Sequence, residues 1–544
     1  MTRWTPRTAI FAALAILPLA QALTAQSGRS PSASIVIVTG QQPTVPIPTL
    51  MEGAAASLGN MELADQLFVR LAELGPTLLT AGDRNFVPVL ARSWTRRDSV
   101  TLAFDLDPRA RWQDGVPVTA RDVVFTFGRA RDPAIAPRLA DLLRHITSVT
   151  AEGERRVVFR FSHPYAEQLY DATFHVAPLP AHLLDTIPAE GLGRSSFVTQ
   201  PVGSGPYRLV RNVPGQFVEL AANPEFFLGR PKLDRVIIRI AADADARLNM
   251  LLSGQADAMD NVPPPLDNLR RVAADSSLRL IPVPSPTVGF LLFNQRDRHD
   301  RSQPHPILSD LRVRRAITQS LDRRLMVQAV FGSYGQVPYG PVSPLLWIRH
   351  RSPKPALQSL AESRRLLAAA GWRDTDGDGV LDRDGRPLAL ELALPNTSGI
   401  RRQMAQLAQE QLRQIGIKLE LQSLEFPVWA ERHAAGNFDI DFSSTVQDPS
   451  PAGLTQAWTC NGGSNAAKYC DPRVDSLMEQ AVLGKGDPGH NWIAALQQIE
   501  ADAPATFLYA PTYVYAVKRR FRDVKISPTS SWILLREWSA GPAR

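Results

Sequence analysis

The chain has 544 residues, of which 44% are hydrophobic and 21% are charged, a balance typical of folded soluble proteins. This length allows two to four domains with cores large enough to fold without disulfides or metals. The net charge of +7 comes from arginines that are scattered and alternate with acids. The continuous basic stripe of nucleic-acid-binding proteins is therefore not present, and we expect no nucleic-acid partner.

The N-terminal residues have the pattern of a secretory signal peptide. Arg3 and Arg7 precede an apolar stretch, and small residues at Ala22 and Ala25 offer cleavage sites. The apolar stretch is shorter than the roughly 20 residues that a bilayer span requires, which favours export with cleavage over a membrane anchor. We therefore predict a signal peptide over residues 1–25 and a periplasmic location. Without it the net charge falls to +5, and no cysteine lies nearby to carry a lipid anchor.

The first half of the mature chain reads as strands with a few helices. Residues 34–40 form a β-branched run typical of a buried strand, and leucines spaced four, four and three apart predict a helix over 62–74. Alternating apolar residues predict a strand over 100–106, and Thr119 is a plausible N-cap for the helix that follows. The segment 201–240 predicts several short strands, and a helix from about residue 242 should end at Gly254.

The second half alternates strands and helices, which indicates an α/β unit. A Pro-rich stretch over 281–287 precedes it and is interpreted as a crossing between domains. The helical periods cover residues 310–330, 357–370, 400–415 and 472–483, and the strands cover 388–393, 418–424 and 438–442.

The two cysteines, Cys460 and Cys470, fall in one short segment. In a cytosolic protein such a pair would suggest a metal or redox site, whereas in an exported protein a local disulfide is the simpler interpretation. We favour the disulfide and expect no cofactor.

Residues 374–385 imitate the first half of a calcium-binding loop. Asp374, Asp376 and Asp378 occupy the first, third and fifth positions, but Gly385 stands at the twelfth, where a bidentate Glu is needed. A turn between a helix and a strand is therefore favoured, and any calcium binding should be weak and structural.

Catalytic motifs are not found in the sequence. It has neither a Gly-x-Ser-x-Gly elbow nor a His-Glu-x-x-His helix, and the nine histidines do not pair at ligand spacing. GSGPY over 203–207 lacks the Lys-Ser or Lys-Thr ending of a phosphate-binding loop, so its glycines are expected to serve the backbone and to place Tyr207 on a strand. We predict that the protein is not an enzyme.

Ten or so collinear segments resemble the peptide and nickel family of bacterial extracellular solute-binding proteins. They include LARSW at 90–94, WQDGVPVTARDVVFTF at 112–127, PVGSGPYRLV at 201–210, LLSGQADAMDNVP at 251–263 and EQLRQIGIKLEL at 410–421. This resemblance covers nearly the whole mature chain. It implies an α/β fold of the periplasmic-binding-protein type II, with two lobes that close on a ligand and an accessory domain on lobe I.

The resemblance also implies boundaries and partners. Lobe I would comprise 34–71, 198–286 and 507–544, lobe II would be the accessory domain over 72–197, and lobe III would cover 287–506. Two strands crossing between the lobes would form a hinge. The protein would be a monomer that delivers a small solute, a peptide or a peptide-like compound, to an ABC permease and ATPase complex at the inner membrane.

In the peptide receptors of this family, a strand of lobe III brings an aromatic residue and an amine-binding Asp to the ligand. Here the equivalent positions hold Phe442 and Thr445, so the acidic anchor is missing, and Asp448 would replace it only if the loop ran differently. The resemblance implies a ligand-binding set that contains three aromatic side chains. The set is Phe290, Asn294, Phe442, Ser443, Ser444, Thr445 and Trp458.

The anchor for the ligand carboxylate is missing as well. Pro395 and Asn396 stand where dipeptide receptors carry an Arg, although Arg401 and Arg402 follow closely. A cleft for zwitterionic dipeptides would keep both counter-charges, because an unpaired buried charge costs several kcal/mol. A longer or modified peptide is therefore expected. The alternatives are a non-peptide solute, such as a glycoside or metal chelate, and a role as a sensor or chaperone.

Overall fold

The structure is a computed structural model that describes residues 33–51 and 57–541. The predicted signal peptide lies outside the described residues. Within these ranges, no helix combines the length and the apolar character needed to cross a bilayer. The names lobe I, lobe II and lobe III are kept below for the ranges predicted from the sequence.

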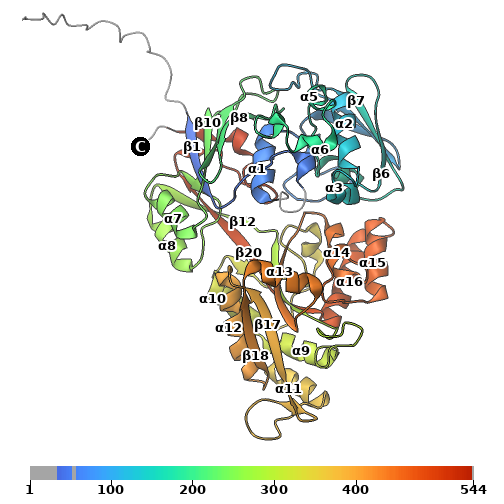
Figure 1. The fold of residues 1–544 in the computed structure, drawn as a ribbon, viewed down its shortest axis with the longest axis vertical. Coiled ribbons are helices and arrows are strands. Elements are labelled where there is room, and N and C mark those ends of the chain that lie inside the picture. The colour runs from blue at the N-terminus through green and yellow to red at the C-terminus, as the bar shows by residue number, and fades with distance from the viewer. Residues whose placement is uncertain (1–32, 52–56, 542–544) are drawn as a thin grey trace, which may run out of the picture.

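A single mixed sheet runs through lobes I and III (Figure 1). Its central order is β18-β17-β19-β13-β20-β11-β1-β10-β9-β8, with β12 and β14 also paired to β20. The strands of lobe I are β1 (Ser34–Thr39), β8 (Tyr207–Val213), β9 (Phe217–Ala222), β10 (Arg235–Ile240), β11 (Ala258–Met259) and β12 (Leu278–Pro284). Those of lobe III are β13 (Thr287–Phe293), β14 (Gly335–Gln336), β17 (Ala389–Pro395), β18 (Lys418–Leu424) and β19 (Ile440–Val446).

The long strand β20 (Ala505–Lys518) belongs to both lobes. Its first residues pair with β13, and its later residues pair with β12 and β11. The chain passes from β12 to β13 through Ser285 and Pro286, within the stretch that the sequence marked as a crossing. Lobes I and III are thus joined by neighbouring extended segments, the arrangement that a hinge requires.

Lobe II contains a four-stranded antiparallel sheet of order β4-β5-β7-β6. Phe159 on this sheet contacts the ring edges of Phe104 and Phe127, at centroid distances of 5.3 and 4.9 Å. Thr119 is the N-cap of the helix that carries Phe127, and its backbone N–H donates to the Asp122 carboxylate at 2.7 Å. The strands are β4 (Ala91–Asp98), β5 (Thr101–Leu106), β6 (Ile146–Ala151) and β7 (Arg156–Phe161), with the short pair β2 (Ala72–Leu74) and β3 (Phe86–Pro88) beside them. The helices are α2 (Ala120–Ala130), α3 (Pro137–Leu142), α4 (Gln168–Thr173), α5 (Ala181–Leu184) and α6 (Ala189–Leu192).

Helices cover the remaining faces of the large sheet. Those of lobe I are α1 (Leu58–Leu67), α7 (Ala244–Leu252) and α8 (Leu266–Ala274), and Gly254, with φ +78°, follows the end of α7 as predicted. Lobe III has two buried apolar clusters, one containing Phe442 and one containing Trp458. Its helices are α9 (Leu311–Ser320), α10 (Arg323–Phe331), α11 (Leu360–Ala369), α12 (Gly399–Arg413), α13 (Phe426–Ala435), α14 (Thr455–Trp458), α15 (Pro472–Val482) and α16 (Pro488–Asp502). Two further pairs are β15 (Asp382–Arg383) with β16 (Arg386–Pro387) and β21 (Phe521–Arg522) with β22 (Ser539–Ala540).

Two predicted helices differ from the structure. The helix expected over 62–74 begins earlier, at Leu58 behind the N-cap Ser57, and ends at Leu67, because Phe68 is extended. The chain then enters strand β2, so the later leucines of the pattern do not belong to the helix. The helix expected over 310–330 is two helices, because Leu321 is extended and Asp322 caps a new helix by accepting from the Leu325 N–H.

Candidate functional site

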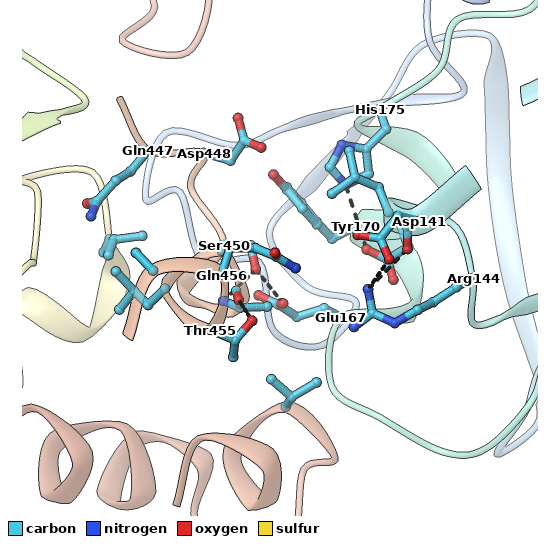
Figure 2. Close-up of a pocket in the computed structure, with 18 of the residues that line it drawn as sticks. Asp141, Arg144, Glu167, Tyr170, His175, Gln447, Asp448, Ser450, Thr455 and Gln456 are labelled. Atoms are coloured by element: carbon cyan, nitrogen blue, oxygen red, sulfur yellow. Dashed lines mark hydrogen bonds and ion pairs between the residues drawn. The ribbon is translucent and has the colours of Figure 1, made fainter. Parts of the chain in front are cut away.

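A cavity of about 410 Å³ lies between lobe II and lobe III (Figure 2). Its lobe II wall comes from α3 and the segment leading to β6, and from α4 and the residues around it. Its lobe III wall is the end of β19 and the loop and short helices over 445–458. The cavity is therefore built by parts of the chain that are far apart in sequence.

The lobe III wall is held in place by its own polar contacts. Ser450 accepts from the Ala452 N–H at 3.1 Å and starts the turn of residues 451–454, and Pro451 occupies its first position. Gln447 accepts from the Ser343 N–H at 2.9 Å and donates to the Pro341 carbonyl. These contacts fix the loop that follows β19, so its side chains are presented to the cavity in a defined arrangement.

Of the seven predicted ligand-binding residues, Thr445 and Trp458 line this cavity. Trp458 is only 2% exposed, and its ring packs edge-on against Phe290 and Phe507, at centroid distances of 5.7 and 5.3 Å. Phe290 therefore supports Trp458 from behind and does not line the cavity.

The other predicted residues lie elsewhere. Phe442 is fully buried in the lobe III core beside Tyr509, and the Asn294 amide donates to two backbone carbonyls, those of Gly436 and Phe438, at 2.9 and 2.8 Å. The physical reason is that both side chains serve the interior of lobe III: Phe442 packs against apolar neighbours, and Asn294 supplies donors to buried backbone carbonyls. Neither side chain is among those that line the cavity.

Ser443 and Ser444 lie on opposite faces of β19, as successive strand residues do. Ser444 accepts a hydrogen bond of 2.6 Å from Arg401, whose guanidinium also lies 5.1 Å from the ring centre of Trp429. Within residues 33–51 and 57–541 Arg401 forms no ion pair with a carboxylate, so its positive charge stands uncompensated beside β19.

Ser443 lies near a His and an Asp, the three residue types of a hydrolytic triad. His433 Nδ1 is 2.6 Å from Asp441 Oδ2 and 3.4 Å from Ser443 Oγ, so the serine and the aspartate share one ring nitrogen. In a catalytic triad the base uses one nitrogen for each partner. Asp441 also accepts from the Trp429 indole at 3.0 Å, which identifies the group as a structural network.

Lobes II and III are joined at the cavity by Glu167. Its carboxylate accepts from Ser450 of lobe III at 2.5 Å (Figure 2). It also accepts from the Thr80 hydroxyl of lobe II. The pKa of Glu167 is raised to about 7, mainly by burial and to a lesser extent by nearby Asp171, although the two hydroxyl donors and His175 act in the opposite direction. The carboxyl group that links the lobes therefore titrates near neutral pH.

The cavity has more acidic than basic groups. Asp141 is paired with Arg144 at 3.4 Å, and Asp171 accepts from the Tyr165 hydroxyl at 2.7 Å. Its carboxylates are Asp141, Glu167, Asp171 and Asp448, and its guanidinium groups are Arg138 and Arg144. An anionic ligand is disfavoured by this charge balance. None of the lobe II residues was anticipated from the sequence.

Cys460 and Cys470 form a disulfide, with an S–S distance of 2.10 Å, directly after the helix that ends in Trp458. It closes a loop that is also fastened by Asp475, which accepts from the Cys460 N–H at 3.0 Å. The redox and metal alternatives for this pair are set aside, because both sulfurs are used in the bond.

We expect the double substitution of Cys460 and Cys470 by serine to lower the free energy of unfolding by about 2–3 kcal/mol, the loop-entropy value for a loop of this length. Denaturant unfolding of the disulfide-bonded protein, with and without reductant, measures the loss. Reductant should destabilise the native protein and leave the double variant unchanged; an equal response of both would contradict the prediction.

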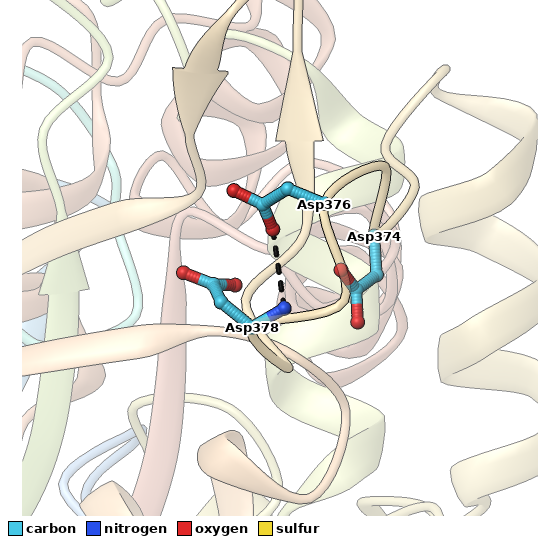
Figure 3. A group of neighbouring side chains, drawn as sticks. All are labelled: Asp374, Asp376 and Asp378. Carbon is cyan, nitrogen blue, oxygen red and sulfur yellow. Dashed lines mark hydrogen bonds between the residues drawn. The ribbon is translucent and has the colours of Figure 1, made fainter.

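Asp374, Asp376 and Asp378 come together at an exposed turn (Figure 3), with one oxygen from each within 4.8 Å of the others. Their carboxylates accept from amides of the same turn: Asp374 from Gly377 at 2.7 Å, Asp376 from Asp378 at 3.1 Å and Asp378 from Val380 at 2.7 Å. The turn that the sequence favours explains why these three carboxylates lie together, since each accepts from an amide of that turn. Weak calcium binding stays a prediction.

Comparisons with known proteins agree with this architecture. The model of the bacterial extracellular solute-binding proteins, family 5 (middle region), matches residues 85–467. The oligopeptide-binding protein AppA of Bacillus subtilis (strain 168) is 28% identical over 449 residues, covering 80% of both chains.

Solved structures share the fold. That of B. subtilis AppA in complex with a nonapeptide has a TM-score of 0.76 at 25% identity, covering 94% of this chain and 100% of the other. NikZ from Campylobacter jejuni in complex with Ni(L-His) has a TM-score of 0.77 at 21% identity and the same coverage. At this identity the likeness to NikZ concerns the fold alone.

Proposed function

The chain belongs to family 5 of the bacterial extracellular solute-binding proteins, and on that premise we propose that it is the substrate-capturing component of an ABC importer. The observation that carries the proposal is the cavity between lobe II and lobe III, in a molecule whose lobes I and III are joined by neighbouring extended segments. Ligand would stabilise the closed arrangement by binding it in preference to the open one. The protein would bind and release, without catalysis.

A peptide or peptide-like solute is the ligand we propose. AppA, which is similar over four-fifths of its length, is named as an oligopeptide-binding protein, and its structure holds a nonapeptide. The acidic lining disfavours ligands with excess negative charge, and Thr445 stands where dipeptide receptors carry an Asp. A peptide longer than a dipeptide, or a modified one, fits both observations.

A metal chelate is the second candidate, favoured by the likeness to NikZ with its bound Ni(L-His). A glycoside, or a role as a sensor or chaperone, would use the same two-lobed capture. In each case we place the mature protein in the periplasm after removal of residues 1–25, as a monomer that meets a permease and ATPase complex.

Native mass spectrometry of the protein as purified from its periplasm tests the ligand class. We expect added masses that fragment into amino acids, and a library of synthetic peptides from dipeptides to nonapeptides should compete for binding. Bound nickel or sugar fragments without peptide would replace the peptide proposal by the corresponding alternative. Turnover of the library would contradict the binding role itself.

Closure should take up a proton at Glu167, since its carboxyl group is enclosed between the lobes in this structure. The raised pKa means that the closed form is favoured below about pH 7 and that this advantage is lost as pH rises through that value. Asp171, His175, Tyr165 and Tyr170 line the same cavity as this carboxyl group and interact with it electrostatically.

Ligand affinity should therefore fall by up to about tenfold between pH 6 and pH 8, if the open form titrates at the ordinary pKa. Calorimetry in buffers of different ionisation enthalpy measures both the affinity and the proton uptake. The Glu167→Gln variant keeps the hydrogen-bonding shape and should lose the pH dependence. An unchanged slope in that variant would assign the titration to another group.

A further inference from the structure

Tyr170 of lobe II carries a buried hydroxyl group without a partner. The residue is 1% exposed and lines the cavity, yet its hydroxyl makes no hydrogen bond to any described residue. Its ring is stacked on Phe174 at a centroid distance of 4.6 Å and meets the edge of His175 at 5.1 Å. The direction of the hydroxyl is therefore fixed by packing.

This hydroxyl is a permanent hydrogen-bond donor. Burial and the carboxylates of Asp448 and Glu167 raise the pKa of Tyr170 well above its usual range, so it does not ionise at physiological pH. A buried donor without an acceptor is destabilising, because it has given up its hydrogen bonds to water. The group is thus prepared for an acceptor that this chain does not provide.

Asp448 stands opposite, on the lobe III loop after β19 (Figure 2). It is exposed and lines the cavity, and within the described ranges its carboxylate has neither a hydrogen bond nor an ion pair. The two groups influence each other electrostatically without bonding. A ligand group placed between them would meet a donor on one side and an acceptor on the other.

We propose that Tyr170 and Asp448 together recognise an amide group of the ligand, whose carbonyl accepts from Tyr170 and whose N–H donates to Asp448. A carboxylate would have nothing to donate to Asp448 and would be repelled by it. A cation would leave the Tyr170 hydroxyl without an acceptor. The inference rests on the proposed function, and it assigns to the accessory lobe a direct part in ligand specificity.

The hydroxyl of a sugar is also both donor and acceptor, but the amide is favoured because its two polar atoms lie on opposite sides of one planar group. Such a group can span two walls that come from different lobes. Recognition then becomes possible only when lobes II and III are brought together, as they are by the bond between Ser450 and Glu167.

The test measures affinities of the full mature chain by calorimetry for synthetic peptides that bind the native protein. Tyr170→Phe should weaken binding about three- to tenfold and Asp448→Asn about ten- to a hundredfold, the ranges for neutral and charged hydrogen bonds. In the double variant the two losses should not add, because both residues bind one group. Tyr339→Phe and Asp378→Asn, which lie outside the cavity, serve as matched controls.

Ester analogues of the peptides identify the group. Replacing the recognised amide by an ester removes the N–H that donates to Asp448, so the analogue should bind the native protein more weakly than the parent peptide does, as the parent peptide should bind Asp448→Asn more weakly. The same ester should show no further loss with that variant and should still respond to Tyr170→Phe. Thermal unfolding should find Tyr170→Phe no less stable than the native chain, since its hydroxyl is unpaired.

The outcomes separate this inference from the proposed function. If peptides bind and both variants equal the native protein within about twofold, a margin below one neutral hydrogen bond, the inference is overturned while the peptide function stands. A loss at Asp448→Asn limited to cationic peptides would also overturn it, as would selective binding of hydroxylated compounds. Failure of every peptide to bind the native protein would instead refute the proposed function.

Discussion

The Gly203→Ala variant is expected to lose at least about 3 kcal/mol of folding free energy, beyond the usual range for overpacking. A Cβ atom at this position would lie 1.9 Å from the carbonyl oxygen of Leu67. That oxygen cannot move away easily, because it ends helix α1 and accepts from the Gly205 N–H at 2.8 Å. Gly203 also exchanges hydrogen bonds with Gln113 of lobe II, so the clash would disturb the junction of lobes I and II.

Denaturant unfolding measures this loss, with Gly193→Ala as the matched control. A Cβ at Gly193 would meet no atom within 4 Å, and its φ of −64° suits any residue. We expect the control to unfold at the native midpoint and Gly203→Ala at a clearly lower one. Equal midpoints for the two variants would mean that helix α1 can shift without cost.

Replacing Arg314 by methionine should destabilise lobe III by about 4 kcal/mol, in the range found when a buried charged hydrogen-bond network loses one member. Arg314 is 5% exposed, and its guanidinium donates to the carbonyls of Leu308 at 2.7 Å, Asp502 at 2.8 Å and Ala503 at 3.0 Å. Burial lowers its pKa to about 10, so it stays charged at neutral pH. Methionine fills much of the volume but leaves these carbonyls without donors.

The Arg324→Met variant is the control, since Arg324 is exposed on the neighbouring helix α10. Limited proteolysis and denaturant unfolding should detect early opening of lobe III in Arg314→Met alone. Because the three lobes need not unfold together, fragments released from residues 287–506 identify the lobe that opens. Opening that starts in lobe II would contradict the assignment.

Local patterns predicted the elements of the lobe III sheet well. The strand expected over 418–424 is β18, and the helices expected over 400–415 and 472–483 are α12 and α15 within two residues. These segments have clear periodicity and local caps, such as Ser398 before α12 and Asp471 before α15. Local sequence is sufficient where the start signal and the apolar face agree.

Other elements were decided by contacts that are distant in sequence. The helix expected over 62–74 ends at Leu67, where Gly203 and Gly205 pack against its last carbonyl. The long strand β20 was not predicted, because it is buried against both lobes and its sequence shows no simple alternation. Periodicity alone cannot identify a strand that is covered on both faces.

The sequence by itself determined the family, the two-lobed α/β fold and the cysteine pair, because these depend on local motifs and their order along the chain. Only the tertiary structure decided which side chains face the cavity. Phe442 lies in the core of lobe III and Trp458 lines the cavity. Glu167 and Tyr170 of the accessory lobe line the same cavity. The physical reason is that a cavity between lobes is formed by packing across hundreds of residues, and such packing leaves no signal in local periodicity.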